Sequence, residues 1–153
     1  MRSHPSDSTR RWTEGDYSVT TDRARFDIDV ATSFLAEHSY WAQGRTAESE
    51  AVAADHSRCY AVIDDRSGEQ VGGARAVTDF AFFAWIADVF VVPAARGAGV
   101  GKFLMRCIVD DLSGVDRLFL GTRDAHGLYA QVGFVAPPRP ERWMERLLDP
   151  PRL

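Results

Sequence analysis

Residues 88–102 read Asp-Val-Phe-Val-Val-Pro-Ala-Ala-Arg-Gly-Ala-Gly-Val-Gly-Lys and decide the fold of this chain. The β-branched run at the start predicts a strand that ends at Pro93. Three glycines in five residues then remove Cβ atoms where a loop must tighten and bring backbone N–H groups close to a ligand. From Val100 the apolar spacing predicts a helix, whose unpaired N–H groups and positive dipole end would face that ligand. The stretch is therefore typical of a pyrophosphate-binding loop.

Two better-known phosphate loops do not fit these residues. A Walker loop would need a glycine at Arg96 and a magnesium-binding hydroxyl at Phe103. A dinucleotide fingerprint starting at Gly97 would need its third glycine at Lys102. An ordinary tight turn is the remaining alternative. The pattern that is left is R-x-x-G-x-G, carried by Arg96, Gly99 and Gly101.

A second motif lies between residues 118 and 134. Residues 118–120 predict a short buried strand, residues 122–124 offer capping side chains, and helical spacing follows. A core tyrosine on an amphipathic helix with a C-cap glycine explains the same periodicity. The pattern is A-x-x-L-Y-x-x-x-G-F, formed by Ala125, Leu128, Tyr129, Gly133 and Phe134.

In this order and at this distance, the two patterns resemble the signatures of the GNAT superfamily of acyl-CoA-dependent N-acetyltransferases. The resemblance implies a mixed α/β (α+β) fold with a central twisted sheet of about six or seven strands, splayed in the middle and flanked by about four helices. Five further runs look like those of small single-domain bacterial members of this family, a group that mostly lacks assigned substrates. These runs are residues 39–42, 77–79, 85–90, 122–129 and 141–144.

The resemblance also implies a co-substrate, acetyl-CoA, and no metal. Backbone groups of Val89, Phe90 and Val91 would line the acetyl group and pantetheine arm, and Tyr129 would protonate the coenzyme thiolate. Thr122 occupies the position where many relatives carry a cofactor-contacting Asn, and its alternative role is that of a helix N-cap. The pyrophosphate would be bound by Arg96, Gly97, Ala98, Gly99, Val100, Gly101 and Lys102.

The general base is the point where the chain departs from the family pattern. A lysine-like amine has a pKa of about 10.4 and must lose a proton before it attacks a thioester. Many relatives place Glu two residues before the position of Val89, where this chain has Ala87. Asp88 would point to the other face of a regular strand, although a β-bulge could re-aim it. Asp88 and Asp79 are our candidates, with a solvated or ion-paired structural carboxylate as the alternative. Further candidates are Glu37 and His38.

An acceptor site is expected in the loop between the first two predicted helices. Trp41 is the first choice for a substrate contact there, with Tyr40 and Arg45 beside it, because loops carry binding residues more often than buried elements do. The acceptor would be a small-molecule amine or a protein amino group.

Composition narrows the class of protein. The net charge is −4 and the sequence pI is about 5.5, so no basic surface predicts binding to nucleic acid or to an anionic membrane. Cys59 and Cys107 are too few for a disulfide framework or a metal site and are expected to be reduced core thiols. Because no apolar run reaches the ~18 residues that span a bilayer, we expect a cytoplasmic protein. A homodimer is one of the assemblies that the sequence leaves open.

The expected organisation is a mobile tail over residues 1–14 and one acetyltransferase domain over residues 15–153. Residues 142–147 are expected to form a last strand, with a short helix as the alternative. The expected function is transfer of an acetyl group from acetyl-CoA to an amine by direct attack in a ternary complex. The alternative is a non-catalytic acyl-CoA-binding sensor or regulatory module on the same fold.

Overall fold

The computed structural model describes residues 8–40 and 42–148. Six strands form one sheet in the order of the sequence; all neighbours are antiparallel except β5 and β6, which are parallel. The predicted mixed α/β fold, with six strands and four helices, is thereby confirmed. The strands are β1 (Arg11–Glu14), β2 (Tyr17–Thr20), β3 (Arg58–Asp64), β4 (Glu69–Thr78), β5 (Ala84–Val91) and β6 (Leu118–Phe119). The helices are α1 (Ile28–His38), α2 (Ala47–Asp55), α3 (Val100–Asp111) and α4 (His126–Ala130).

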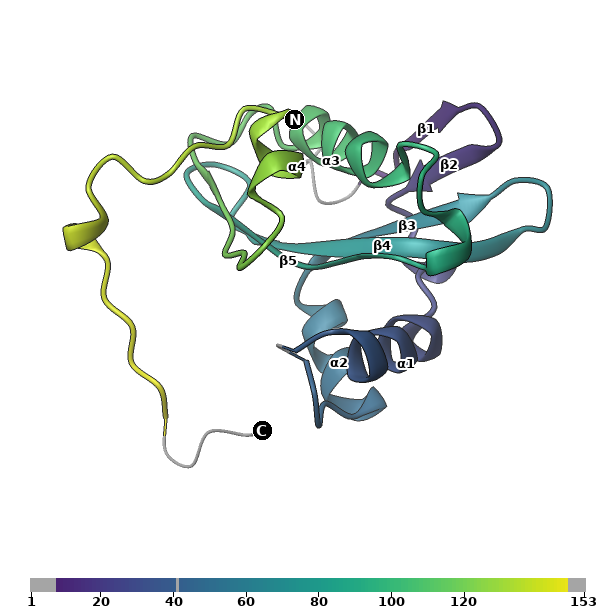
Figure 1. Ribbon diagram of the computed structural model, residues 1–153, viewed down its shortest axis with the longest axis horizontal. Coiled ribbons are helices and arrows are strands. Elements are labelled where there is room, and N and C mark those ends of the chain that lie inside the picture. Colours follow the sequence, from purple (N-terminus) through teal and green to yellow (C-terminus); the bar gives the residue numbers. More distant parts are fainter. Residues whose placement is uncertain (1–7, 41, 149–153) are drawn as a thin grey trace.

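Helices cover both faces of the sheet (Figure 1). Helices α1 and α2 lie on one face and α3 and α4 on the other. The alternation of β3 supplies both cores, because Cys59, Ala61 and Ile63 pack toward α1 and α2 while Tyr60 and Val62 pack toward α3. The chain therefore has two apolar layers that share one sheet.

Helix α3 is the main support of the second layer. Its buried side chains recur at the i, i+3, i+4, i+7, i+8 positions expected of one helix face. No helix in residues 8–40 and 42–148 is both long enough and apolar enough to cross a bilayer. The buried residues of α3 are Val100, Phe103, Leu104, Met105, Cys107 and Ile108.

The expectation of a mobile tail over residues 1–14 is wrong for its last four residues. Residues 11–14 form β1, which pairs with β2 across a turn where Gly15 has a φ of +58°. Trp12 holds this hairpin on α3, since its indole Nε1 donates to Asp110 at 2.9 Å, and Arg10 pairs with the same carboxylate at 2.7 Å. Short exposed strands carry little periodicity, which is why the pattern of the sequence did not indicate this one.

The last predicted strand does not form. A 3-10 turn covers Pro140–Arg142, and residues 143–148 continue without helix or strand. Prolines at 137, 138 and 140 lack backbone donors and favour an extended direction. The chain runs away from the sheet after them (Figure 1). Alternation alone did not show whether these residues would have a neighbouring strand to pair with.

Both cysteines are free and buried, one in each apolar layer. Burial raises the pKa of the Cys59 thiol to about 11 and that of Cys107 to about 12. The two side chains therefore behave as small apolar core residues at neutral pH.

A carboxylate at the end of α3 joins the helix to the sheet. Asp111 accepts hydrogen bonds from the Arg58 Nε at 2.9 Å and the Tyr60 hydroxyl at 2.8 Å, and its side chain is 4% exposed. Its neighbour Asp110 is 58% exposed and pairs with Arg10 near the surface.

These adjacent residues form a matched test of burial. Asp111→Asn should lower the free energy of unfolding by about 3 kcal/mol or more, because it leaves the Arg58 guanidinium buried without its counter-charge. Asp110→Asn should cost about 1 kcal/mol or less, because its pair lies in water. Urea unfolding of both variants measures the difference, and equal losses would show that Asp111 does not hold α3 to β3.

Candidate active site

The sheet is incomplete on the side of β5 that faces β6. Strand β6 pairs with β5 only at Ala84↔Leu118 and Trp85↔Phe119. In the described part of the chain, the side of β5 that faces β6 has no further strand partner from Ile86 to Val91. An extended molecule could take the place of the missing strand, because backbone N–H and C=O groups along such an edge are available for pairing.

A β-bulge lies within this open part of β5. Gly73 pairs with Phe90 and Arg75 with Ala87, so Asp88 and Val89 together lie opposite the single residue between them on β4. Asp88 adopts a φ of +55°, in the left-handed region. The bulge shifts the alternation of the strand: Ile86 packs toward α3, whereas Phe90 packs toward α1 and α2. The structure therefore contains the β-bulge that could re-aim the Asp88 side chain.

The glycine loop follows directly on this strand. Gly97 has a φ of +86° and Gly99 a φ of +73°, and a Cβ atom at either position would meet no heavy atom within 4 Å. Gly99 is the N-cap of α3 and supplies no side-chain cap. The first N–H groups of α3, including those of Val100 and Gly101, thus point from an uncapped helix end toward open space.

The other residues of the loop differ in their surroundings. The Arg96 side chain donates from Nε to the carbonyl oxygen of Val91 at 3.1 Å, and its guanidinium lies 5.8 Å from the centre of the Phe34 ring. Ala98 and Lys102 are exposed, whereas the Val100 side chain is buried in the core. Val100 can therefore offer a ligand only its backbone, while Lys102 offers a mobile positive charge.

Helix α4 lies against the same corner. A Cβ atom at Gly101 would lie 3.7 Å from Leu128, so the residue before Tyr129 packs on the glycine turn. The Tyr129 ring meets Phe134 edge to face, with centroids 6.1 Å apart. Within residues 8–40 and 42–148 its hydroxyl has no hydrogen-bond partner. Burial raises the pKa of Tyr129, and the charge of Asp124 adds to this effect. The hydroxyl is thus protonated at neutral pH and available to a ligand.

The loop before α4 contacts the loop after α1. The guanidinium of Arg123 lies 3.7 Å from the centre of the Tyr40 ring, a cation–π contact between two segments far apart in the sequence. Thr122 accepts a hydrogen bond on its hydroxyl from the Ala125 N–H at 3.0 Å, which is the local capping role. The sequence analysis did not select Arg123 for the site; its position beside Thr122, in a run shared with the resembled family, was the available signal. Trp41 lies outside the described residues.

The bulge residue Asp88 is held by two guanidinium groups. Its carboxylate accepts from Arg45 Nη1 at 2.8 Å and from Arg75 Nε at 2.6 Å, and Arg45 also pairs with the buried Glu50 at 3.1 Å. Burial alone would raise the pKa of Asp88, but the two positive charges and their hydrogen bonds outweigh it and lower the pKa. A low-pKa carboxylate with both oxygens engaged is a poor proton acceptor. These contacts favour structural roles for Asp88 and Arg45 over the expected base and acceptor contact.

Asp79 also has a local structural role. Its Oδ1 accepts hydrogen bonds from the N–H groups of Ala81, Phe82 and Phe83 at 2.8 to 3.1 Å, and these bonds lower its pKa. The residue precedes β5, whereas the glycine loop follows it. The structure therefore does not bring the two candidate bases together at the loop.

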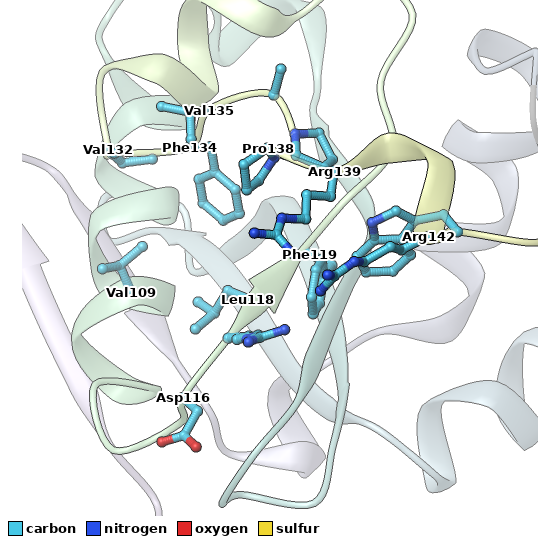
Figure 2. A pocket seen from close by; sticks show the side chains of 15 residues that line it. Val109, Asp116, Leu118, Phe119, Val132, Phe134, Val135, Pro138, Arg139 and Arg142 are labelled. Atoms are coloured by element: carbon cyan, nitrogen blue, oxygen red, sulfur yellow. The ribbon is translucent and has the colours of Figure 1, made fainter.

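A cavity of about 960 Å³ lies elsewhere, on the outer side of β6 (Figure 2). Val109 of α3 and Leu118 of β6 line it, with Phe134 and Arg139 from the chain after α4. None of the residues of the glycine loop borders it. In the described part of the chain, no three His, Cys, Asp or Glu side chains are grouped as a metal site would need.

Comparison with known proteins identifies the family to which the chain belongs. A family model described as an acetyltransferase (GNAT) domain matches residues 55–136. The chain belongs to the GNAT acetyltransferase family. A crystal structure from Xanthomonas campestris pv. campestris, provisionally named a GNAT-family acetyltransferase, is 39% identical, with 92% of this chain and 98% of that chain covered and a TM-score of 0.83.

Two more distant matches agree with the family. A protein of Gibberella zeae with a provisional acetyltransferase name is 28% identical, with 80% of each chain covered. A Staphylococcus aureus structure shares the fold with a TM-score of 0.69 at 18% identity, over 86% of this chain and 98% of that one. The glycine loop and the open edge of β5 both lie inside the segment that the GNAT model matches.

The role of Asp88 can be tested through stability. Asp88→Asn should lower the free energy of unfolding by about 3 kcal/mol at pH 7, because it removes the counter-charge of Arg75 and leaves Arg45 with Glu50 alone. A lowered pKa stabilises the fold above the unfolded-state value, so the difference from the parent should shrink once the pH falls below about 4. Urea unfolding from pH 7 downward measures it.

Asp29→Asn, on the exposed first turn of α1, is the matched control and should change stability little at either pH. If Asp88→Asn proves as stable as this control, the ion pairs contribute nothing and the carboxylate returns as a candidate base.

Proposed function

We propose that this protein is an acetyl-CoA-dependent N-acetyltransferase that moves the acetyl group to an amine by direct attack in a ternary complex. The observation that carries the proposal is the meeting, in one corner, of two sets of backbone groups that have no backbone partner in the described residues. The open edge of β5 leads to Val91, and the uncapped end of α3 begins at Gly99.

Each part of the coenzyme has a matching feature. The amide groups of the pantetheine arm would pair with backbone groups of Val89, Phe90 and Val91, as an added strand does. The pyrophosphate would bind the N–H groups of residues 97–101, aided by the positive end of the α3 dipole and by Lys102. Arg96 would act through the loop, because its side chain is bonded to Val91.

Tyr129 would serve as the general acid for the coenzyme thiolate. Its helix packs on Gly101, and its hydroxyl is protonated and has no hydrogen-bond partner in the described residues. Because a thiol pKa of about 8.5 already makes the thiolate a fair leaving group, the larger contribution comes from placing the amine against the thioester.

The acceptor would enter between the loop after α1 and the loop before α4. Tyr40 and Arg123 line this side, and the exposed Asp124 adds a negative charge beside Tyr129. The net charge of −4 also favours a cationic acceptor, either a small-molecule amine or a protein amino group.

A second candidate function is a non-catalytic acyl-CoA sensor. The observation that favours it is the engagement of both candidate bases, Asp88 and Asp79, in structural hydrogen bonds. Release of free thiol from acetyl-CoA in the presence of a panel of amines separates the two functions, because a sensor binds the coenzyme without consuming it.

Coenzyme binding should be visible as thermal stabilisation. At a CoA concentration ~100 times its dissociation constant, the gain in unfolding free energy should be about 2.7 kcal/mol. Gly99→Glu should abolish it by placing a carboxylate among amides meant for phosphate. Gly68→Glu is the matched control, because Gly68 has a φ of +76° and equally open surroundings in the turn between β3 and β4. Stabilisation by NADH or ATP but not by CoA would refute the assignment.

Tyr129→Phe keeps the ring and removes only the proton donor. Turnover should fall roughly 10- to 1000-fold while the melting temperature stays near that of the parent, because the hydroxyl has no hydrogen-bond partner among residues 8–40 and 42–148 to lose. Thiol release and thermal unfolding on one preparation give both numbers. A variant with parental turnover at every pH would remove Tyr129 from the mechanism, and Tyr17→Phe in β2 controls for loss of a phenol elsewhere.

A further inference from the structure

A row of apolar side chains crosses the sheet where β6 ends. Val77 of β4, Trp85 of β5 and Phe119 of β6 lie opposite one another in register, so all three point to the same face. Ala84 and Ile86, on either side of Trp85, belong to the α3 layer, which puts the row on the face of α1 and α2. Val77 is 41% exposed and Trp85 39%. The apolar row is therefore partly open to solvent.

Helices α1 and α2 cover the other end of β5. Helix α1 packs there through Phe34, whose ring lies 5.1 Å from that of Phe90, and the turn between β4 and β5 extends beyond both helices (Figure 1). On the side of β6, Gly121 lies against the Trp85 ring, because a Cβ atom at Gly121 would be 3.8 Å from it. A partly open aromatic ring beside a binding site is the kind of surface that holds the apolar part of a small ligand.

The apolar row lies next to the expected position of the acetyl group. With the pyrophosphate at the glycine loop and the pantetheine arm along residues 89–91, the thioester would lie toward the start of β5, at Ala87. Ala87 points to the same face as Trp85, two residues along the strand. At a rise of about 3.3 Å per residue, about 7 Å separates the two positions. An aromatic ring on a chain of two or three carbons spans such a distance to its terminal nitrogen.

The charged side chains beside the row pair with one another. Arg75, opposite Ala87, donates to the Asp88 carboxylate at 2.6 Å. Asp79, in the turn before β5, accepts hydrogen bonds from three backbone N–H groups. A second ammonium group or a carboxylate on the acceptor would have to compete with these contacts, whereas an apolar group gains free energy by leaving water. This face therefore favours an acceptor with one amine and an apolar body.

We propose that the acceptor is a primary amine that carries an aromatic or other flat apolar group two or three carbons from its nitrogen, and that the Trp85 ring binds this group. The inference rests on the proposed acetyl transfer and names the substrate class for it.

Apolar surroundings would also aid the reaction when no carboxylate is free to act as a base. They lower the pKa of the ammonium group of the acceptor, which then releases its proton to water. The neutral nitrogen forms a bond to the acetyl carbon as the C–S bond breaks. The departing sulfur takes the Tyr129 proton, and the proton that the new amide nitrogen loses returns through water to the tyrosine.

Thiol release with 2-phenylethylamine and ethylamine tests the substrate class, because these amines differ only by the phenyl ring. The value of kcat/KM should be about 10- to 100-fold higher for 2-phenylethylamine, as expected when a ring is buried. Trp85→Ala should lower this ratio about 10-fold, mainly through KM, and keep the thermal stabilisation by CoA. Trp85→Phe should preserve most of the ratio, and Val77→Lys should lower it by placing a charge beside the ring. Phe82→Ala, at a side chain that is 70% exposed in the turn before β5, is the control and should leave the ratio unchanged.

Calorimetric titration of both amines into the CoA-bound chain separates this inference from the proposed function. Tighter binding of 2-phenylethylamine that is lost in Trp85→Ala, without thiol release, would support the acceptor surface and refute acetyl transfer. Thiol release with equal kcat/KM for the two amines would support acetyl transfer and overturn the inference. Equal or undetectable binding of both amines, a preference that survives Trp85→Ala, or a higher kcat/KM for spermidine would also overturn it.

Discussion

Asp88 lies where β5 changes the face to which its side chains point, and the guanidinium groups of Arg45 and Arg75 hold it there. A left-handed φ at a residue other than glycine costs of order 1–3 kcal/mol and persists only where the surroundings impose it. Here two ion pairs impose it, from β4 on one side and from the loop before α2 on the other. If the carboxylate were free, the strand could return to regular pairing. Phe90 would then leave the layer of α1 and α2.

This bulge explains why the candidate site is built mainly from backbone. Because β6 is short, the far half of β5 has β4 on one side and no strand of the described residues on the other, and the glycine loop places the uncapped end of α3 at the end of that strand. Both features present unpaired backbone groups, which any sequence of suitable conformation would supply. The site residues that can be identified from the sequence are therefore the glycines that permit this conformation and Tyr129, whose side chain adds a proton donor.

The sequence predicted what depends on near neighbours. The period of α3 and the glycine turn before it are both local, and each was confirmed. The partners of Asp88 could not be predicted, because Arg45 lies 43 positions away and Arg75 lies 13 positions away on another strand. The same limit applied at both ends of the chain. Strand β1 depends on contacts of Trp12 with α3, and residues 142–147 alternate like a strand without one beside them.

The burial of the two cysteines has a practical consequence at the bench. Because Cys59 and Cys107 are buried and protonated near neutral pH, a chromogenic disulfide reagent should not react with the native chain. After denaturation the same reagent should titrate two thiols per molecule. The ratio of these two readings gives the unfolded fraction of any preparation without a label. The same reagent can then follow coenzyme release, since the native protein contributes no background colour.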